Sequence, residues 1–208
     1  MNYLEKFNKD FRGYVNSKLH AKWGSIRCSL TTPIARIELL LMGVEIGRNS
    51  SFYGLPYFHR SPESTIMIGD HCVFRSFATS NLIGINHKCI ISTHSHNAII
   101  KIGNKSGFSG VTIAAAKQIN IKNSVLIGAN VIISDFDWHM DRRVYNDPQP
   151  ITIEDNVIVG VNSVIWKGVS IGRNSVIGAM SVVTKDVPEN CVAAGNPARI
   201  IRKLHISD

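Results

Sequence analysis

The most constraining feature of the sequence is a six-residue repeat that runs from Ile153 to Pro188. Cut every six residues, this run reads IEDNVI, VGVNSV, IWKGVS, IGRNSV, IGAMSV and VTKDVP. The first places hold Ile or Val, the second places often hold Gly, and the fifth places hold Val or Ser. A helix cannot produce this period, because six is not a whole number of 3.6-residue turns. The repeat therefore predicts a parallel β-solenoid in which each hexad is one short strand and one corner.

The hexad also predicts where side chains lie in such a solenoid. β-Branched first residues such as Ile153 and Ile171 should point inward and stack on their equivalents in neighbouring coils. The glycine of the second place, as in Gly172, allows the backbone to bend at a corner where a side chain would be costly. Three hexads then make one triangular coil.

The solenoid is predicted over residues 46–190, with repeats at 46–134 and 151–188 that are cleanest in the second span. Ile133 and Ile153 are 20 positions apart, which is not a multiple of six. A loop over residues 135–150 must therefore leave the coil, and it reads DFDWHMDRRVYNDPQP. Function is expected where a regular scaffold carries one polar and aromatic loop.

Residues 1–45 lack the hexad and are predicted to form an N-terminal helical segment. Apolar residues from Tyr3 to Leu19 recur at spacings of three and four, which is typical of an amphipathic helix, and Pro33 is expected to interrupt it. We expect the helix to pack on the solenoid. A helix resting on an anionic membrane surface is the alternative.

The C-terminal residues 191–208 are predicted to form a cap or tail. Gly195-Asn196-Pro197 is a turn signal. We expect a short basic helix over residues 198–205 to close the open end of the solenoid, because terminal repeats require a cap.

Composition indicates a globular protein, since 44% of the residues are hydrophobic and 18% are charged. The net charge of +8 suggests either a basic face or an anionic partner, but no nucleic-acid-binding motif accompanies it. None of the four cysteines forms a CxxC pair, so zinc or redox chemistry is not expected. With no visible signal peptide, these features lead us to expect a cytoplasmic location.

The loop offers a candidate general base. His139 has the side chain most often used for proton transfer near neutral pH. Asp135 and Asp137 precede it and could orient or charge-stabilise its imidazole. A surface histidine in an arbitrary sequence is more often idle, so its place in this loop is what makes it a candidate.

A set of motifs carries a family resemblance. They are DWH at 137–139, ITI at 151–153, VIGA at 176–179, VTKD at 183–186 and AAGNPAR at 193–199. Together they resemble the sugar O-acetyltransferases of the hexapeptide-repeat acyltransferase family, among them the galactoside, maltose, colanic acid and capsular enzymes. The resemblance covers residues 100–204 and implies a left-handed parallel β-helix. That handedness rests on the resemblance alone, since physical rules favour right-handed parallel crossovers.

The resemblance also implies a mechanism. His139 would remove the proton from a saccharide hydroxyl, whose oxygen would attack the thioester of acetyl-CoA without a covalent enzyme intermediate or a metal. Asp137 is the first candidate to fix the imidazole tautomer. The implied assembly is a homotrimer with each active site between two subunits. The first 100 residues look more like the polysaccharide-modifying members, so the implied acceptor is a cell-surface polysaccharide or its precursor.

The resemblance assigns residues to coenzyme A as well. Those beside the pantetheine arm are Gly160, Val161 and Ala179. Those at the adenosine and phosphate end are Thr184, Lys185, Arg199 and Arg202. The chemistry is consistent, because a polyphosphate needs fixed cations.

Three alternatives stay open at this point. One is an N-acetyltransferase acting on an amino-sugar nucleotide or an antibiotic, and another is a non-catalytic β-solenoid scaffold. The third is a metal-dependent hydratase, because His94 and His96 form an HxH pair like those that chelate zinc. His87, His94 and His96 could instead line the acceptor cleft. The aromatic residues at 52–58 could be core or a sugar-stacking platform.

Overall fold

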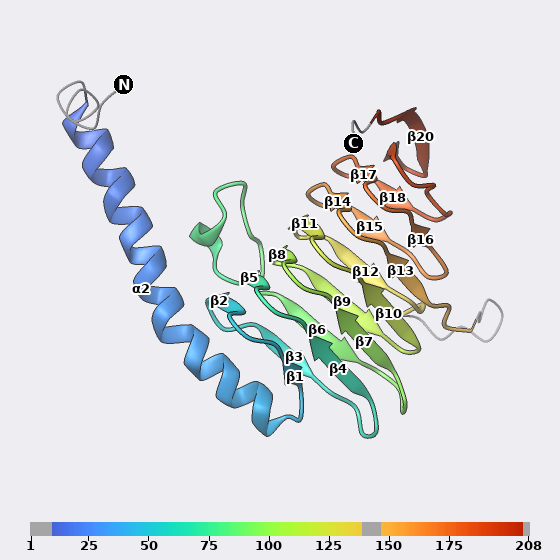
Figure 1. The fold of residues 1–208 in the computed structure, drawn as a ribbon, viewed down its shortest axis with the longest axis horizontal. Helices are drawn as coiled ribbons and strands as arrows, with labels where there is room; N and C mark the ends of the chain where they lie inside the picture. The colour runs from blue at the N-terminus through green and yellow to red at the C-terminus, as the bar shows by residue number, and fades with distance from the viewer. Residues whose placement is uncertain (1–9, 139–146, 206–208) are drawn as a thin grey trace.

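The body of the molecule is a triangular prism made of three parallel sheets. The computed structural model describes residues 10–138 and 147–205 of the chain. We call the three sheets faces A, B and C, and the chain winds around them in that order, so that each coil adds a strand to each face (Figure 1). This is the left-handed parallel β-helix that was predicted.

The strands of each face are short. Face A contains β1 (Glu45–Ile46), β4 (Thr65–Ile68), β7 (Ile99–Ile102), β10 (Gln118–Ile121), β13 (Ile151–Ile153) and β16 (Ser170–Ile171). Face B contains β2 (Ser51–Tyr53), β5 (Val73–Arg75), β8 (Gly107–Ser109), β11 (Leu126–Ala129), β14 (Ile158–Val159), β17 (Val176–Ile177), β19 (Cys191–Gly195) and β20 (Ala198–Lys203). Face C contains β3 (Tyr57–His59), β6 (Ile90–Thr93), β9 (Thr112–Ala115), β12 (Ile132–Ser134), β15 (Val164–Ile165) and β18 (Val182–Val183). The helices within residues 10–138 and 147–205 are α2 (Phe11–Leu41) and the 3-10 turn η1 (Ala78–Ser80).

The hexad side chains lie as predicted. Ile153 pairs with Ile171 on face A and Val159 with Ile177 on face B, each one coil later in the sequence. These side chains are all at most 1% exposed. The fifth places are buried too, and Ser163 and Ser175 there donate to the carbonyls of Gly178 and Pro188, at 3.0 and 2.7 Å. The core is therefore a set of stacked columns that run the length of the prism.

The glycines of the second places are required by the stacking of one coil on the next. A Cβ added to Gly172 would lie 2.4 Å from the backbone nitrogen of Glu189. One added to Gly160 would lie 2.5 Å from the backbone nitrogen of Ala179. The corners are thus too closely packed for a side chain, as the repeat predicted.

The N-terminal coils depart from the hexad in their core residues. Phe52, Phe74 and Phe108 occupy the inward column of face B, and they stack with ring centroids 5.1 and 4.9 Å apart. Phe58 is buried on face C. Of the aromatic residues at 52–58, Phe52 and Phe58 belong to the core, whereas Tyr57 is 49% exposed.

Helix α2 lies across the end of the prism at which the coils begin (Figure 1). Ala35 and Leu39 are buried, and the Thr32 hydroxyl accepts the backbone N–H of Phe52 at 3.0 Å, which covers the edge strand β2. The helix continues across Pro33, so the predicted interruption is wrong. Burial of Ala35 and Leu39 beyond the proline favours helix there, and Pro33 itself faces solvent.

The C-terminal segment is a strand, so the predicted short helix over residues 198–205 is wrong. The chain turns back after Gly195, and strand β20 pairs antiparallel with β19, with Ala194 opposite Arg199. The hairpin provides backbone partners for the last edge of face B, which a helix would have left open. The hairpin follows the last coil, at the end of the prism opposite α2 (Figure 1), and the capping role of residues 191–208 stays a prediction.

Candidate functional site

The loop over residues 135–150 leaves the prism at the corner between faces C and A. It begins after β12 and ends before β13. Both ends are fixed by backbone bonds, because Gln149 N–H donates to Asp135 C=O at 2.9 Å and Gly168 N–H donates to Gln149 C=O at 3.1 Å. A second loop, over residues 76–89, leaves at the corner between faces B and C. The two loops therefore emerge from different corners of the prism.

Asp135 anchors the start of the first loop. Its carboxylate is fully buried and accepts the backbone N–H groups of Ala116, Lys117 and Gln118 at 2.6, 2.9 and 2.6 Å. Burial raises the pKa of Asp135, while the three N–H donors oppose that rise by favouring the ionised form. Asp135 thus holds the loop against the neighbouring coil, which accounts for its presence without a role in proton transfer.

Asp137 forms an ion pair with Lys167, which lies at the same corner one coil further on. Only 10% of the lysine side chain and 30% of the aspartate side chain are exposed, so the pair is largely shielded from water. Sequence reasoning did not find Lys167, because the third place of a hexad is normally a solvated corner. His139 lies outside the described residues, and its predicted contact with Asp137 stays a prediction.

Four rings gather where the loop begins. The His94 ring lies 5.0 Å from Phe136, 5.1 Å from Trp138 and 6.1 Å from His59, measured between centroids. His94 Nε2 is also 2.8 Å from the Ser92 hydroxyl. Burial lowers the pKa of His94, and the nearby His59 lowers it further. The structure therefore places His94, but not His96, beside the candidate loop.

The other histidines make separate contacts. His96 faces Glu63 at 3.7 Å, and both side chains are largely exposed. His87 lies in the second loop, where its Nδ1 is 2.8 Å from its neighbour's carbonyl oxygen. Within residues 10–138 and 147–205, no three His, Cys, Asp or Glu side chains are grouped to hold a metal ion. The four cysteines are free thiols.

The predicted coenzyme A residues lie at two corners of the prism and on the edge strand β20. Gly160, Val161 and Ala179 follow β14 and β17, so they line the corner between faces B and C. Ala179 is exposed. Glycine is required at position 160 for packing alone, because a side chain there would collide with the Ala179 backbone. This corner presents small residues along the prism.

The residues predicted for the adenosine and phosphate end of coenzyme A lie in two separate places. Thr184 and Lys185 follow β18 and lie at the C–A corner, on the same side as the loop. Arg199 and Arg202 lie on β20 at the edge of face B. All four side chains are exposed. Within one chain, face C separates Gly160 and Ala179 from Lys185 and Asp137, so the structure does not bring the predicted set together in a single subunit.

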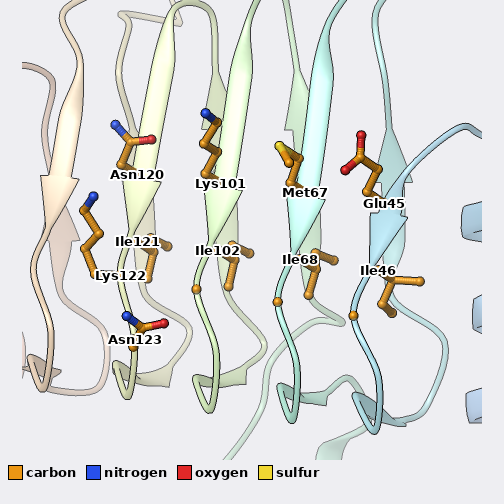
Figure 2. A pocket seen from close by; sticks show the side chains of 13 residues that line it. Glu45, Ile46, Met67, Ile68, Lys101, Ile102, Asn120, Ile121, Lys122 and Asn123 are labelled. Carbon is orange, nitrogen blue, oxygen red and sulfur yellow. The ribbon is translucent and has the colours of Figure 1, made fainter.

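A groove of about 520 Å³ lies elsewhere, on the outer surface of face A. Figure 2 shows Glu45, Met67, Lys101 and Asn120 in a row across its four strands. None of the predicted site residues lines it. It is therefore not part of the candidate active site.

No helix in the described part of the chain has both the length and the apolar character needed to cross a bilayer. This includes α2, whose 31 residues contain charged side chains throughout.

Known proteins are similar to this chain in sequence over about half of its length and in fold over most of it. The hexapeptide repeat of succinyl-transferase matches residues 150–185. The galactoside O-acetyltransferase of Escherichia coli strain K12 is 43% identical over 102 residues, which are 47% of this chain and 50% of that protein. The Lactococcus lactis galactoside O-acetyltransferase is 40% identical over 103 residues, covering 47% and 49%. The chain thus spans about half the length of these curated relatives.

A solved structure extends the likeness to most of the chain. AntD, an N-acyltransferase from Bacillus cereus determined with dTDP-4-amino-4,6-dideoxyglucose and coenzyme A, superposes with a TM-score of 0.61. The match covers 82% of this chain and 90% of that one at 17% identity, and at that identity it shows the fold alone. In its repeat, its prism and these partial sequence matches, the chain is similar to the hexapeptide-repeat acyltransferases.

Proposed function

We propose that the chain is an acetyl-CoA-dependent O-acetyltransferase that acts on a saccharide hydroxyl of a cell-surface polysaccharide or its precursor, in the cytoplasm. The galactoside O-acetyltransferases among its relatives support the acceptor class. The observation that carries the proposal is that the predicted residues lie at two corners of the prism, with small residues at one corner and the Asp137–Lys167 pair and Lys185 at the other.

This division suits an active site shared by two subunits. If three prisms turn face C toward a common axis, the B–C corner of each meets the C–A corner of the next. Gly160, Val161 and Ala179 of one chain would then face Asp137 and Lys185 of its neighbour. Face C has apolar side chains for such an interface, since Ile132 is 38% exposed and lies in register with Val164 and Val182. The proposed assembly is therefore a homotrimer.

The residues at these corners fit acetyl-CoA. Ala179 leaves room for the slim pantetheine arm, whereas a large side chain there would obstruct it. Lys185, Arg199 and Arg202 are exposed cations that can pair with the phosphates. Thr184 would lie beside the adenosine. No metal takes part in the proposed reaction.

The proposed reaction is a direct transfer. His139 accepts the proton of the acceptor hydroxyl while the oxygen forms a bond to the acetyl carbonyl carbon. The tetrahedral intermediate collapses, the carbon–sulfur bond breaks, and the thiolate of coenzyme A leaves and takes up the proton that His139 had accepted. A general base of this kind contributes about 10²–10⁴-fold to the rate. Asp137, held by Lys167, would fix the orientation of the loop that carries His139.

Release of coenzyme A thiol from acetyl-CoA in the presence of candidate sugars tests the proposal. We expect turnover with a galactoside, a maltoside or a bacterial polysaccharide fragment, and a loss of about 10²-fold or more in kcat for His139→Ala. His71→Ala is the matched control, because His71 lies at a corner between faces A and B. Turnover only with amino sugars would favour the N-acetyltransferase. Absence of turnover together with absence of acetyl-CoA binding would favour the scaffold.

A further inference from the structure

Helix α2 has two different apolar sides. The side that packs on the first coil uses small or buried residues, including Ala35 and Leu39. The opposite side carries a stripe of large apolar residues, which we call the outer stripe. Its members, with their exposed fractions, are Leu19 (50%), Trp23 (61%), Ile26 (40%), Leu30 (62%), Ile34 (52%), Ile37 (60%) and Leu41 (83%). Single exposed apolar residues are ordinary, but a continuous row of this length marks an interaction surface.

The spacing of the outer stripe suits a flat partner. Leu19, Leu30 and Leu41 are each 11 positions apart, and the same interval separates Trp23 from Ile34 and Ile26 from Ile37. An 11-residue period corresponds to about 3.67 residues per turn, closer to a straight α-helix than the 3.5 of a left-handed coiled coil. The stripe therefore stays on one side of the helix along its described length.

The charges on α2 favour an anionic partner. The helix contains five basic residues, Arg12, Lys18, Lys22, Arg27 and Arg36, and one acidic residue, Glu38. Two copies of this helix facing each other would bring like charges together with a single acidic residue on each to offset them. Arg36 donates to the Gly47 carbonyl and Arg27 lies over the Phe77 ring, so the cations offered to a partner lie mainly in the N-terminal part of the helix, at Arg12, Lys18 and Lys22. An anionic lipid surface offers the complementary charge, and a row of Leu, Ile and Trp beside such cations is typical of a helix that lies in a membrane interface.

The position of α2 gives the stripe access to a plane. The helix crosses the end of the prism, and its packed side faces the first coil (Figure 1). The outer stripe consequently points away from the prism, along the direction in which the coils begin. In an assembly of parallel prisms, every copy would present its stripe in that direction. A bilayer surface can contact all of them at once.

We propose that the outer stripe of α2 docks the protein on the surface of anionic lipid membranes without crossing them. The apolar side chains enter the boundary between headgroups and acyl chains, and the flanking cations pair with lipid phosphates. This inference does not rest on acetyl transfer. It is carried by the exposure, the period and the charge of the helix.

Flotation of the full chain with vesicles tests the proposal. One vesicle set is phosphatidylcholine alone, and the other is phosphatidylcholine mixed with phosphatidylglycerol. We expect binding to the anionic set that weakens as salt is raised. The double variant Leu30→Ser/Ile37→Ser should reduce partitioning by about tenfold or more. The control Leu126→Ser/Ile158→Ser changes residues of similar exposure, 51% and 44%, on face B, and should bind like the wild type.

Circular dichroism and the molar mass in solution accompany the flotation. Both double variants should keep the wild-type spectrum, because all four side chains are exposed. The proposal is overturned if the wild type does not bind anionic vesicles, or if the stripe variant binds as well as the control. It is equally overturned if the stripe variant lowers the molar mass and no vesicle binding occurs, since the stripe would then join copies of the chain.

Discussion

The two ends of the prism fill the same core column in different ways. In the first coils, the inward column of face B consists of Phe52, Phe74 and Phe108, which stack ring on ring. In the later coils, the column continues with Val159 and Ile177. All of these side chains are at most 1% exposed. The fold therefore requires an inward apolar side chain and a narrow corner at each turn, and the hexad letters are one of several ways to meet that requirement.

Shortening the aromatic stack should have the largest effect. Phe74→Ala removes the ring between two others and should lower the free energy of unfolding by about 3–5 kcal/mol. Val159→Ala in the same column of the regular coils removes two methyl groups and should cost about 2 kcal/mol. Urea denaturation of both variants measures the difference. Equal losses would contradict the prediction, since Phe74→Ala removes both the larger buried volume and the ring stacking.

Substitution of the buried carboxylate of Asp135, at the start of the loop, should have the second largest effect on stability. Asp135→Asn keeps the volume but replaces an acceptor oxygen with an N–H₂ group that faces backbone donors, and should cost about 2–3 kcal/mol. Asp155→Asn is the comparison from the regular coils. That carboxylate also accepts a backbone N–H, from Asn123 at 2.8 Å, but it is partly exposed, and we expect a smaller loss. Thermal unfolding ranks the two, and a larger loss for Asp155→Asn would contradict the anchoring role of Asp135.

Two glycines should respond with opposite signs to the same substitution. Gly172→Ala places a Cβ 2.4 Å from the Glu189 nitrogen and should destabilise the prism by about 1–3 kcal/mol. Gly24→Ala lies in α2 with nothing within 4 Å of its added Cβ, and should stabilise the chain by about 0.5–1 kcal/mol. The midpoint of denaturant unfolding should fall for Gly172→Ala and rise for Gly24→Ala. A neutral Gly172→Ala would show that the coils can separate at that corner.

The ring cluster should give the smallest effect, visible as a pH dependence. The pKa of His94 is lower in the folded chain than in the unfolded one, so the unfolded state binds more protons near pH 6. The contribution of His94 to stability is therefore present above its unfolded pKa of about 6.5 and is lost as the pH falls toward its folded pKa. NMR titration of the imidazole checks this directly. A His94 pKa at or above the ordinary histidine value of about 6.5 would contradict the burial of this ring.

The sequence predicts the regular coils over residues 151–188 better than it predicts the first coils. The hexads of 151–188 determine the inward columns and the narrow corners, and the loss of phase after Ile133 locates the loop. Each follows from a local rule with a short period. The column of Phe52, Phe74 and Phe108 was harder to predict from the sequence. Phenylalanine stands there in place of the Ile or Val of the hexad, although it meets the same packing requirement.

The predictions that failed depend on contacts between distant segments. Residues 198–203 have no local signal that separates a strand from a short helix, and the open edge of β19 decides the outcome. Pro33 stays helical because Leu39 is buried beyond it. Lys167 is 30 positions from Asp137, and only the winding of one coil brings them together. The separation of the predicted coenzyme A residues Gly160 and Ala179 from Lys185 follows from the same winding.

Calorimetric titration of acetyl-CoA into the purified protein tests the central claim most directly, because it needs no knowledge of the acceptor. We expect about one site per chain, weakened by about tenfold or more in Ala179→Trp, which fills the proposed groove, and in Arg199→Ala. Arg48→Ala, at an exposed corner of the first coil, should bind like the wild type. Absence of binding at millimolar acetyl-CoA, or equal affinity in all four proteins, would contradict the proposed donor site.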